Sequence, residues 1–351
     1  SVFAYDSSSA FWSNFERGEG GFQMIYYYLF FLLLVLTGRD EKTWRLFLWT
    51  TLIAAVLVIS YGVSSFFGII NSGMPTEGGI FGQRFAGSLG NPAYLGSYLL
   101  FSLFFAGFLI FNDKTVKWQR FLLFGLSLLF LFFILLTQTR GAFLGLIVSV
   151  IVFLLFYAFK NPVYRRSLTI AALILVLLFS TLIYFRESPA IKNIPVIGRL
   201  LRVSIFDRSV QSRLWVWQTA YEGWKERPLL GWGPENFTKV FNNRFDIRHF
   251  VPDEPSDTWY DRAHSVFFDY LVETGIFGLL SYLGIFAVFY WQFIKSQITN
   301  YQSLITNALL FTFPVAYLIQ GIVLFEILPL YLLLFFFLAL SNYKLQETKN
   351  D

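Results

Sequence analysis

The chain has 351 residues, of which 56% are hydrophobic, 21% aromatic and only 14% charged. Its apolar runs are about 17–25 residues long, as a helix that crosses ~30 Å of hydrocarbon requires. This pattern excludes a soluble α/β domain, whose apolar runs are shorter and broken by polar positions. The net charge of +5 gives no reason to expect a nucleic-acid partner. The absence of cysteine excludes disulfides, thiolate nucleophiles and cysteine-based metal sites.

The apolar runs predict an all-α polytopic membrane protein with about nine spans. The spans cover roughly 22–36, 46–66, 92–111, 121–137, 141–159, 167–185, 275–294, 303–323 and 327–343. We therefore expect three parts: membrane helices over 1–185 after an outer segment (1–21), a polar loop over 186–263, and membrane helices with a short tail over 264–351. Because no basic stretch precedes the first apolar run, we interpret Ser1 as an internal start rather than as part of a signal peptide.

The basic residues predict the orientation. The connectors 37–45, 112–120, 160–166 and 295–302 and the tail 344–351 hold 12 Lys and Arg residues. The remaining short segments hold three, namely Arg17, Arg84 and Arg140. The positive-inside rule puts the first group in the cytoplasm, and the parity of the spans then puts the long loop outside.

The loop 186–263 concentrates the titratable groups of the chain. It holds 12 of the 27 Lys and Arg residues and His249, and the second histidine, His264, follows its end. Ile191–Ile205 is predicted to be amphipathic and to lie on the outer leaflet. Ser209–Glu226 has the spacing of a helix that Pro228 ends, and a partly polar helix is expected from His264 to Gly275, where the apolar span begins. Since the span centres hold almost no charge, an enzyme at the outer surface is favoured over a carrier.

His264 is the candidate general base. At a helix start, the positive end of the helix dipole disfavours the imidazolium and keeps the ring neutral. Asp261, Asp269 or Glu273 could hydrogen-bond the other ring nitrogen. The alternative is a histidine that only caps or anchors the helix. His249 is interpreted as a solvated loop residue, and a metal site that includes it matches no specific ligand spacing.

The outer arginines could bind an anion. Arg140 lies in a short turn near the hydrocarbon and requires a partner, although snorkelling to lipid headgroups is the alternative. Arg213 lies in the first turn of the loop helix, where a solvated charge is the alternative. Guanidinium groups bind phosphate oxygens bidentately, so several outer arginines beside one neutral histidine suit a diphosphate substrate.

Four segments resemble motifs of the O-antigen ligase/polymerase superfamily and occur in the family's order. They are Gln83–Leu95 (QRFAGSLGNPAYL), Thr137–Ala142 (TQTRGA), Ser212–Gly233 (SRLWVWQTAYEGWKERPLLGWG) and Arg262–Gly278 (RAHSVFFDYLVETGIFG). The N-terminal FWSNFERGEG also resembles a segment of larger members. Members of the family typically have twelve spans, nine of them before the large loop. The resemblance therefore leads us to expect that three N-terminal helices are missing from this chain.

The resemblance implies glycosyl transfer without a metal or other cofactor at the extracytoplasmic face of the bacterial inner membrane. The donor would be a glycan on undecaprenyl diphosphate, and the acceptor a hydroxyl of lipid A–core, of a glycan or of a protein. His264 would be the base, Arg213 and Arg140 would bind the diphosphate, and direct displacement would invert the anomeric centre.

The resemblance also suggests further substrate-binding residues. Arg84 and Arg17 would assist in diphosphate or sugar binding, and Arg262 and Asn236 are assigned to substrate binding. Asn236 also helps to form the loop turn with Gly231 and Gly233.

Two readings within the family stay open beside the ligase, namely a glycan polymerase and a protein O-oligosaccharyltransferase. A flippase for lipid-linked oligosaccharides is a more distant alternative. A flippase should have a polar cavity across several spans, which this sequence does not indicate. A membrane scaffold whose outer loop binds a partner is the non-catalytic alternative.

Overall fold

The structure is a computed structural model that describes residues 2–13, 18–70, 84–194, 196–201, 207–250, 259–296 and 301–350. These residues form α-helices, two short 3-10 helices and connecting turns, with no strand in the described part. Eight of the described helices are long and apolar enough to cross a membrane, and α2 (Gly21–Thr37) is a shorter apolar helix. The all-α polytopic membrane fold is thus confirmed, with eight candidate spans and α2 in place of nine equivalent spans.

The chain divides into two compact units, each built from segments that are far apart in the sequence. Unit 1 contains Ser1–Leu36, Ser204–Lys295 and Gly321–Ala339, and unit 2 contains Thr37–Val203, Ser296–Gln320 and Leu340–Asp351.

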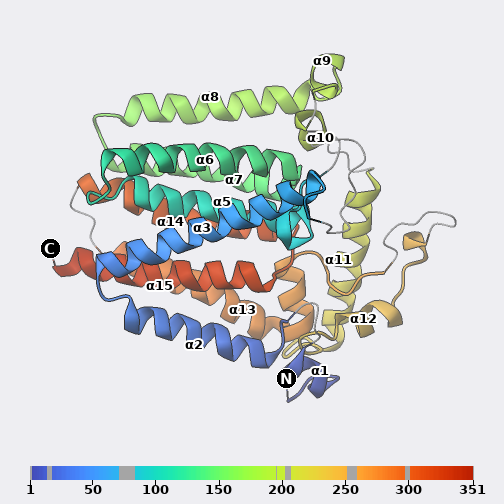
Figure 1. Cartoon of the computed structure of the whole chain (residues 1–351). Helices are drawn as coiled ribbons and strands as arrows, with labels where there is room; N and C mark the ends of the chain where they lie inside the picture. The colour runs from blue at the N-terminus through green and yellow to red at the C-terminus, as the bar shows by residue number, and fades with distance from the viewer. Residues whose placement is uncertain are drawn as a thin grey trace. The chain divides into compact units, whose positions relative to one another are not determined.

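Unit 2 is a helix bundle centred on α5 (Pro92–Ile110). This helix packs against α3 (Glu41–Phe66), α6 (Lys117–Thr137) and α7 (Arg140–Lys160), and α7 packs in turn against α8 (Arg165–Tyr184) (Figure 1). Phe101 of α5 also stacks on Tyr317 of α14 (Tyr301–Gly321). The short helix α10 (Ile197–Leu201) lies within the stretch predicted to be amphipathic, and α9 (Pro189–Lys192) overlaps its start.

Glycines allow a close approach within unit 2. A Cβ at Gly62 of α3 would come within 2.6 Å of the Cα of Gly87, so only glycine permits this contact. Gly87 begins the 3-10 helix η1 (Gly87–Leu89) with a φ of 59°, a conformation that glycine adopts without strain. The segment before α5 is thereby held against α3.

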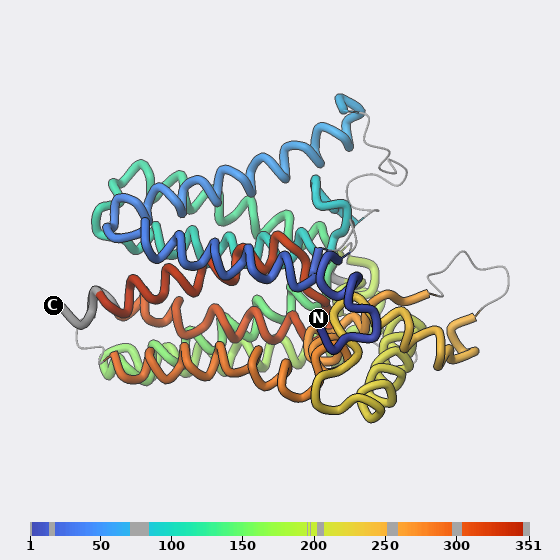
Figure 2. Tube along the Cα trace, turned by 90° about the horizontal axis from the view of Figure 1, so that it is seen from below, coloured from blue at the N-terminus to red at the C-terminus, as the bar shows by residue number. Residues whose placement is uncertain are grey.

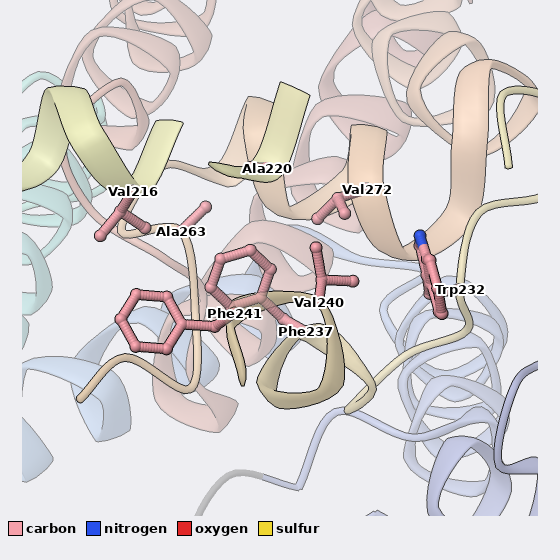
Figure 3. Packing of buried hydrophobic residues seen from close by; sticks show 8 residues of the cluster. All are labelled: Val216, Ala220, Trp232, Phe237, Val240, Phe241, Ala263 and Val272. Atoms are coloured by element: carbon pink, nitrogen blue, oxygen red, sulfur yellow. The ribbon is translucent and has the colours of Figure 1, made fainter. Parts of the chain in front are cut away.

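In unit 1, the polar loop forms its own hydrophobic core (Figure 3). α11 (Arg208–Glu226) and α12 (Phe237–Asn243) pack against α13 (Val266–Lys295). The buried core residues are Val216, Ala220, Trp232, Phe237, Val240, Phe241, Ala263 and Val272. Full burial of one large apolar side chain stabilises a fold by about 1.5–3 kcal/mol, so this cluster can order a loop that has no disulfide.

A second cluster joins α2 to the first turns of α15 (Leu328–Asn350) within unit 1. Tyr27 stacks on Tyr331 and Phe335 with ring centroids 5.0 and 5.9 Å apart. The two helices run side by side in Figures 1 and 2. This packing holds the N-terminal segment of unit 1 to its C-terminal segment.

The predicted boundary at Gly275 is a break within α13. Gly275 has a φ of 67° and interrupts the helical backbone. The amides of Trp232 and Gly233 donate to the carbonyls of Val272 and Glu273 at 2.9 and 2.7 Å. The amide of Ile276, on the other side of the break, donates to the carbonyl of Pro228 at 2.9 Å. The 228–233 turn therefore satisfies backbone groups that the break would otherwise leave unpaired.

Candidate functional site

His264 lies in a short bend before α13, two residues ahead of Val266, where the helix begins. Its backbone is left-handed, with a φ of 54°, which is unusual for a residue with a Cβ. The half-buried imidazole lies between the rings of Tyr260 and Phe325, whose centroids are 5.1 and 5.0 Å away. Two aromatic contacts thus limit the orientations that the ring can adopt.

His249 is not the solvated residue predicted above, because only 2% of it is exposed. Its ring contacts Trp215, Phe241 and Tyr260, and its two ring nitrogens have no hydrogen-bond partner within the described part of the chain. Burial lowers the pKa of His249, since an apolar environment disfavours the imidazolium. His249 therefore belongs to the core of the loop, and His264 is the more accessible of the two histidines.

Arg262, two residues before His264, is the centre of a buried ionic cluster. Its guanidinium is 1% exposed and lies 2.9 Å from Glu19, 2.7 Å from Glu235 and 2.5 Å from Glu273. The contacts join the segment just before α13 to the N-terminal segment, to the loop turn and to α13 itself. Ser13 strengthens the cluster, because its hydroxyl donates to Glu235 at 2.6 Å and accepts from the amide of Glu19 at 2.9 Å.

The cluster perturbs the titration of its members that lie outside the candidate spans. Burial raises the pKa of Glu19 well above its usual range, and the positive charge of Arg262 opposes that shift only in part. Burial alone would lower the pKa of Arg262, but Glu273, Glu19 and Glu235 together raise it. Arg262 is consequently held in its charged form by the surrounding carboxylates. Direct substrate binding by Arg262 stays a prediction.

A cavity of about 40 Å³ lies beside this cluster in unit 1. Four carboxylate residues line it, namely Glu19, Asp269, Glu273 and Glu326. The other lining residues are Met24, Pro234, Val266, Tyr270, Thr274 and Tyr331. Within the described residues, one carboxylate oxygen of Glu19 and one of Asp269 have no hydrogen-bond partner. The cavity therefore presents hydrogen-bond acceptors, which suit a water molecule or a hydroxyl better than an anion.

In unit 2 the first two sequence motifs meet. Arg84 donates from Nε to the carbonyl of Thr137 at 3.1 Å and from Nη2 to the hydroxyl of Thr139 at 3.3 Å. The Thr139 hydroxyl also lies 3.1 Å from the carbonyl of Pro92. Arg84 therefore holds the turn that presents Arg140, the first residue of α7.

The structure places Arg199 of α10 next to Arg140. The sequence indicated Arg199 only as part of an amphipathic stretch. Arg140 Nη2 lies 3.5 Å from the carbonyl oxygen of Arg199. Desolvation and the positive charge of Arg140 lower the pKa of Arg199. Two neighbouring guanidinium groups favour an anion. The basic character of Ile191–Ile205 was the only signal for Arg199 in the sequence.

The other predicted site residues are distributed over the chain. Arg213 is half-buried in α11 of unit 1, as the helical spacing predicts. Asn236 is 5% exposed, and its side-chain amide nitrogen donates to the carbonyls of Asp6 and Pro234 at 3.3 and 3.0 Å. These contacts agree with its expected part in the loop turn, and its binding of substrate stays a prediction. Arg17 lies outside the described residues.

No group of three or more His, Asp or Glu side chains in the described ranges is arranged to hold a metal ion. A metal site with His249 would draw on the Asp/Pro-rich stretch 251–258. That stretch lies outside the described ranges.

Comparison with known proteins gives one family match. Residues 125–283 match the family model described as O-antigen ligase. The matched segment contains Arg140, Arg213, Asn236, Arg262 and His264, whereas Arg84 and Arg17 precede it. No curated protein matches the chain in the sequence search.

Proposed function

We propose that the chain is a membrane enzyme of the O-antigen ligase superfamily that transfers a glycan from undecaprenyl diphosphate to an acceptor hydroxyl. The family match over residues 125–283 supports this proposal. The acceptor is lipid A–core or a similar group, and the reaction takes place at the extracytoplasmic face of the inner membrane. One observation carries the proposal. Of the two histidines in the matched segment, His264 is half-buried between two rings, while His249 is enclosed in the loop core.

In the proposed reaction, the neutral imidazole of His264 accepts the proton of the acceptor hydroxyl. The hydroxyl oxygen forms a bond to the anomeric carbon of the donor as the bond from that carbon to the diphosphate oxygen breaks. The electron pair leaves with the diphosphate, and direct displacement inverts the anomeric centre. No metal is required, because arginine side chains can stabilise the charge of the leaving diphosphate.

Arg213 and Arg140 bind the diphosphate in this proposal. Both are half-buried, and Arg140 is the first residue of α7, where backbone amides also favour an anion. Arg84 supports the Arg140 turn through Thr137 and Thr139. Arg17, Arg262 and Asn236 are assigned to substrate binding as well.

The test is an in vitro transfer assay with purified full-length protein, a lipid diphosphate-linked glycan and separate lipid, glycan and protein acceptors. We expect His264→Ala to lower kcat by about 10²–10⁴-fold, the usual contribution of a positioned base. His249→Phe is the matched control, because it replaces the buried ring without removing the proposed base, and it should retain transfer at neutral pH. Retention of transfer by folded His264→Ala would refute the base assignment, and the acceptor arms separate ligase, polymerase and protein-transferase activities.

A further inference from the structure

The backbone of His264 is held in a conformation that a residue with a Cβ adopts only under restraint. Its φ of 54° is one of five positive values among the non-glycine residues described. Such a conformation persists only where the surrounding structure over-determines it, and it recurs at functional sites. The residues that impose it therefore bear on what His264 can do.

Two carboxylates of α13 fix the chain just before His264. Asp269 Oδ1 accepts from the amide of Ala263 at 2.6 Å, and this contact is buried. Glu273, one turn further along α13, accepts from Arg262 at 2.5 Å. The two residues that precede His264 are thus each bound to a side chain of the helix that follows it.

The chain just after His264 is fixed as well. The amide of Val266 donates to the carbonyl of Leu324 at 2.9 Å. Glu273 is itself anchored, because its backbone carbonyl accepts from the amide of Gly233 at 2.7 Å where α13 breaks. His264 therefore lies in a short bend that is fixed on both sides. Residues before it are hydrogen-bonded to side chains of α13, and Val266 after it is hydrogen-bonded to Leu324 of unit 1.

Asp269 contacts the backbone just before His264, and Glu273 contacts the side chain of Arg262. The sequence suggested that Asp269 or Glu273 could hydrogen-bond a ring nitrogen of His264. Instead, Asp269 bonds Ala263 through one oxygen, and its other oxygen has no hydrogen-bond partner in the described part of the chain. Glu273 pairs with Arg262. The bend sets the position of the imidazole, and the rings of Tyr260 and Phe325 contact it.

We propose that Asp269 and Glu273 are positioning residues for His264, which hold the 262–264 bend so that the imidazole points toward the acceptor hydroxyl. This inference rests on the proposed function in one respect, namely that His264 is the base. The placement of the ring by the two carboxylates is a separate claim that can be tested without any transfer reaction.

The first test uses the fact that the chain has two histidines. In full-length protein labelled with [¹³C]histidine and reconstituted in nanodiscs, the ring signals of His249 and His264 are assigned by the His249→Phe variant. Asp269→Ala should shift the His264 signal and leave the His249 signal in place. Asp269→Asn should leave both near their wild-type positions, since its amide oxygen can still accept from the Ala263 amide.

The second test is kinetic. Displacement of a catalytic group by about 1 Å costs on the order of 10²-fold in rate, so Asp269→Ala should lower kcat by about 10–100-fold. The KM for the donor should stay within about twofold of the wild-type value, because the residues proposed to bind the diphosphate are Arg213 and Arg140 and neither is altered. Asp269→Asn should restore kcat to within about threefold of wild type. Tyr331→Phe is the matched control, and it should leave kcat unchanged. It removes a partly buried hydroxyl contact of 3.0 Å to Tyr270 beside the same cavity and does not alter the bend.

The outcomes separate the two claims. An unchanged His264 ring signal in folded Asp269→Ala refutes the positioning role, whatever the activity. An equal loss of kcat in Asp269→Ala and Asp269→Asn also refutes it, because the Ala263 contact would then not be the cause. A shifted ring signal together with full transfer by His264→Ala supports the positioning of the ring and refutes the proposed function.

Discussion

Replacement of Arg262 by methionine tests whether the buried ionic cluster holds unit 1 together. The side chain of methionine is similar in length to that of arginine. The substitution therefore removes mainly the guanidinium, which contacts Glu19, Glu235 and Glu273 at 2.5–2.9 Å. Removal of one partner from a buried ion pair typically costs about 3–5 kcal/mol, because the remaining charge stays buried. Partial protonation of Glu19 can relieve the penalty, so we expect a loss near the lower end of this range at neutral pH.

The penalty should depend on pH. Burial already raises the pKa of Glu19, and the loss of Arg262 removes the charge that opposes this shift. A group whose pKa is raised in the folded state contributes its stability below the unfolded pKa and loses it as pH rises through the folded pKa. The difference in stability between Arg262→Met and wild type should therefore be larger at pH 8 than at pH 5.

The assay is unfolding of the protein in nanodiscs, followed by circular dichroism at the two pH values. Arg248→Met is the matched control, because Arg248 pairs with Asp246 but its side chain is 52% exposed. Exposed ion pairs contribute little to stability, so this variant should unfold close to wild type. Equal stability of Arg262→Met and Arg248→Met, or a deficit that does not grow with pH, would refute the reasoning.

The remaining predictions concern the helix break, the loop core and the metal. Gly275→Ala should destabilise the protein by about 2 kcal/mol or more, since the φ of 67° disfavours alanine and the new Cβ would lie 2.3 Å from the carbonyl oxygen of Leu229. Gly284→Ala in the same helix meets open space and should be neutral or stabilising, so equal midpoints of unfolding for the two variants would contradict this account. Because burial lowers the pKa of His249, wild-type stability should fall as pH drops through about 6.5, the unfolded value. His249→Phe should lack that fall, and an identical pH profile in unfolding experiments would count against it. Transfer should persist in EDTA; loss of activity that a divalent ion restores would overturn the metal-free mechanism.

Local patterns in the sequence predicted most of the helices. Runs of apolar residues determine where a helix can enter hydrocarbon, and the expected span 92–111 corresponds to α5. The expected helix Ser209–Glu226 corresponds to α11, because the 3–4 residue spacing of its aromatic side chains and Pro228 are both local signals. The expected boundary at Gly275 coincides with the break in α13. In each case, residues that are neighbours in the chain carry the information.

The partners of the polar residues could not be predicted in this way. His249 was expected in solvent because its sequence neighbours are polar, but residues from α11 and α12 and Tyr260 enclose it. No local pattern indicated that Glu19, Glu235 and Glu273 surround the guanidinium of Arg262. The sequence by itself determined which segments are helical and apolar, since these properties depend on composition and local spacing. Only the tertiary structure decided which charges are buried together and what holds His264, because the cost of burying a charge depends on partners that folding brings from distant parts of the chain.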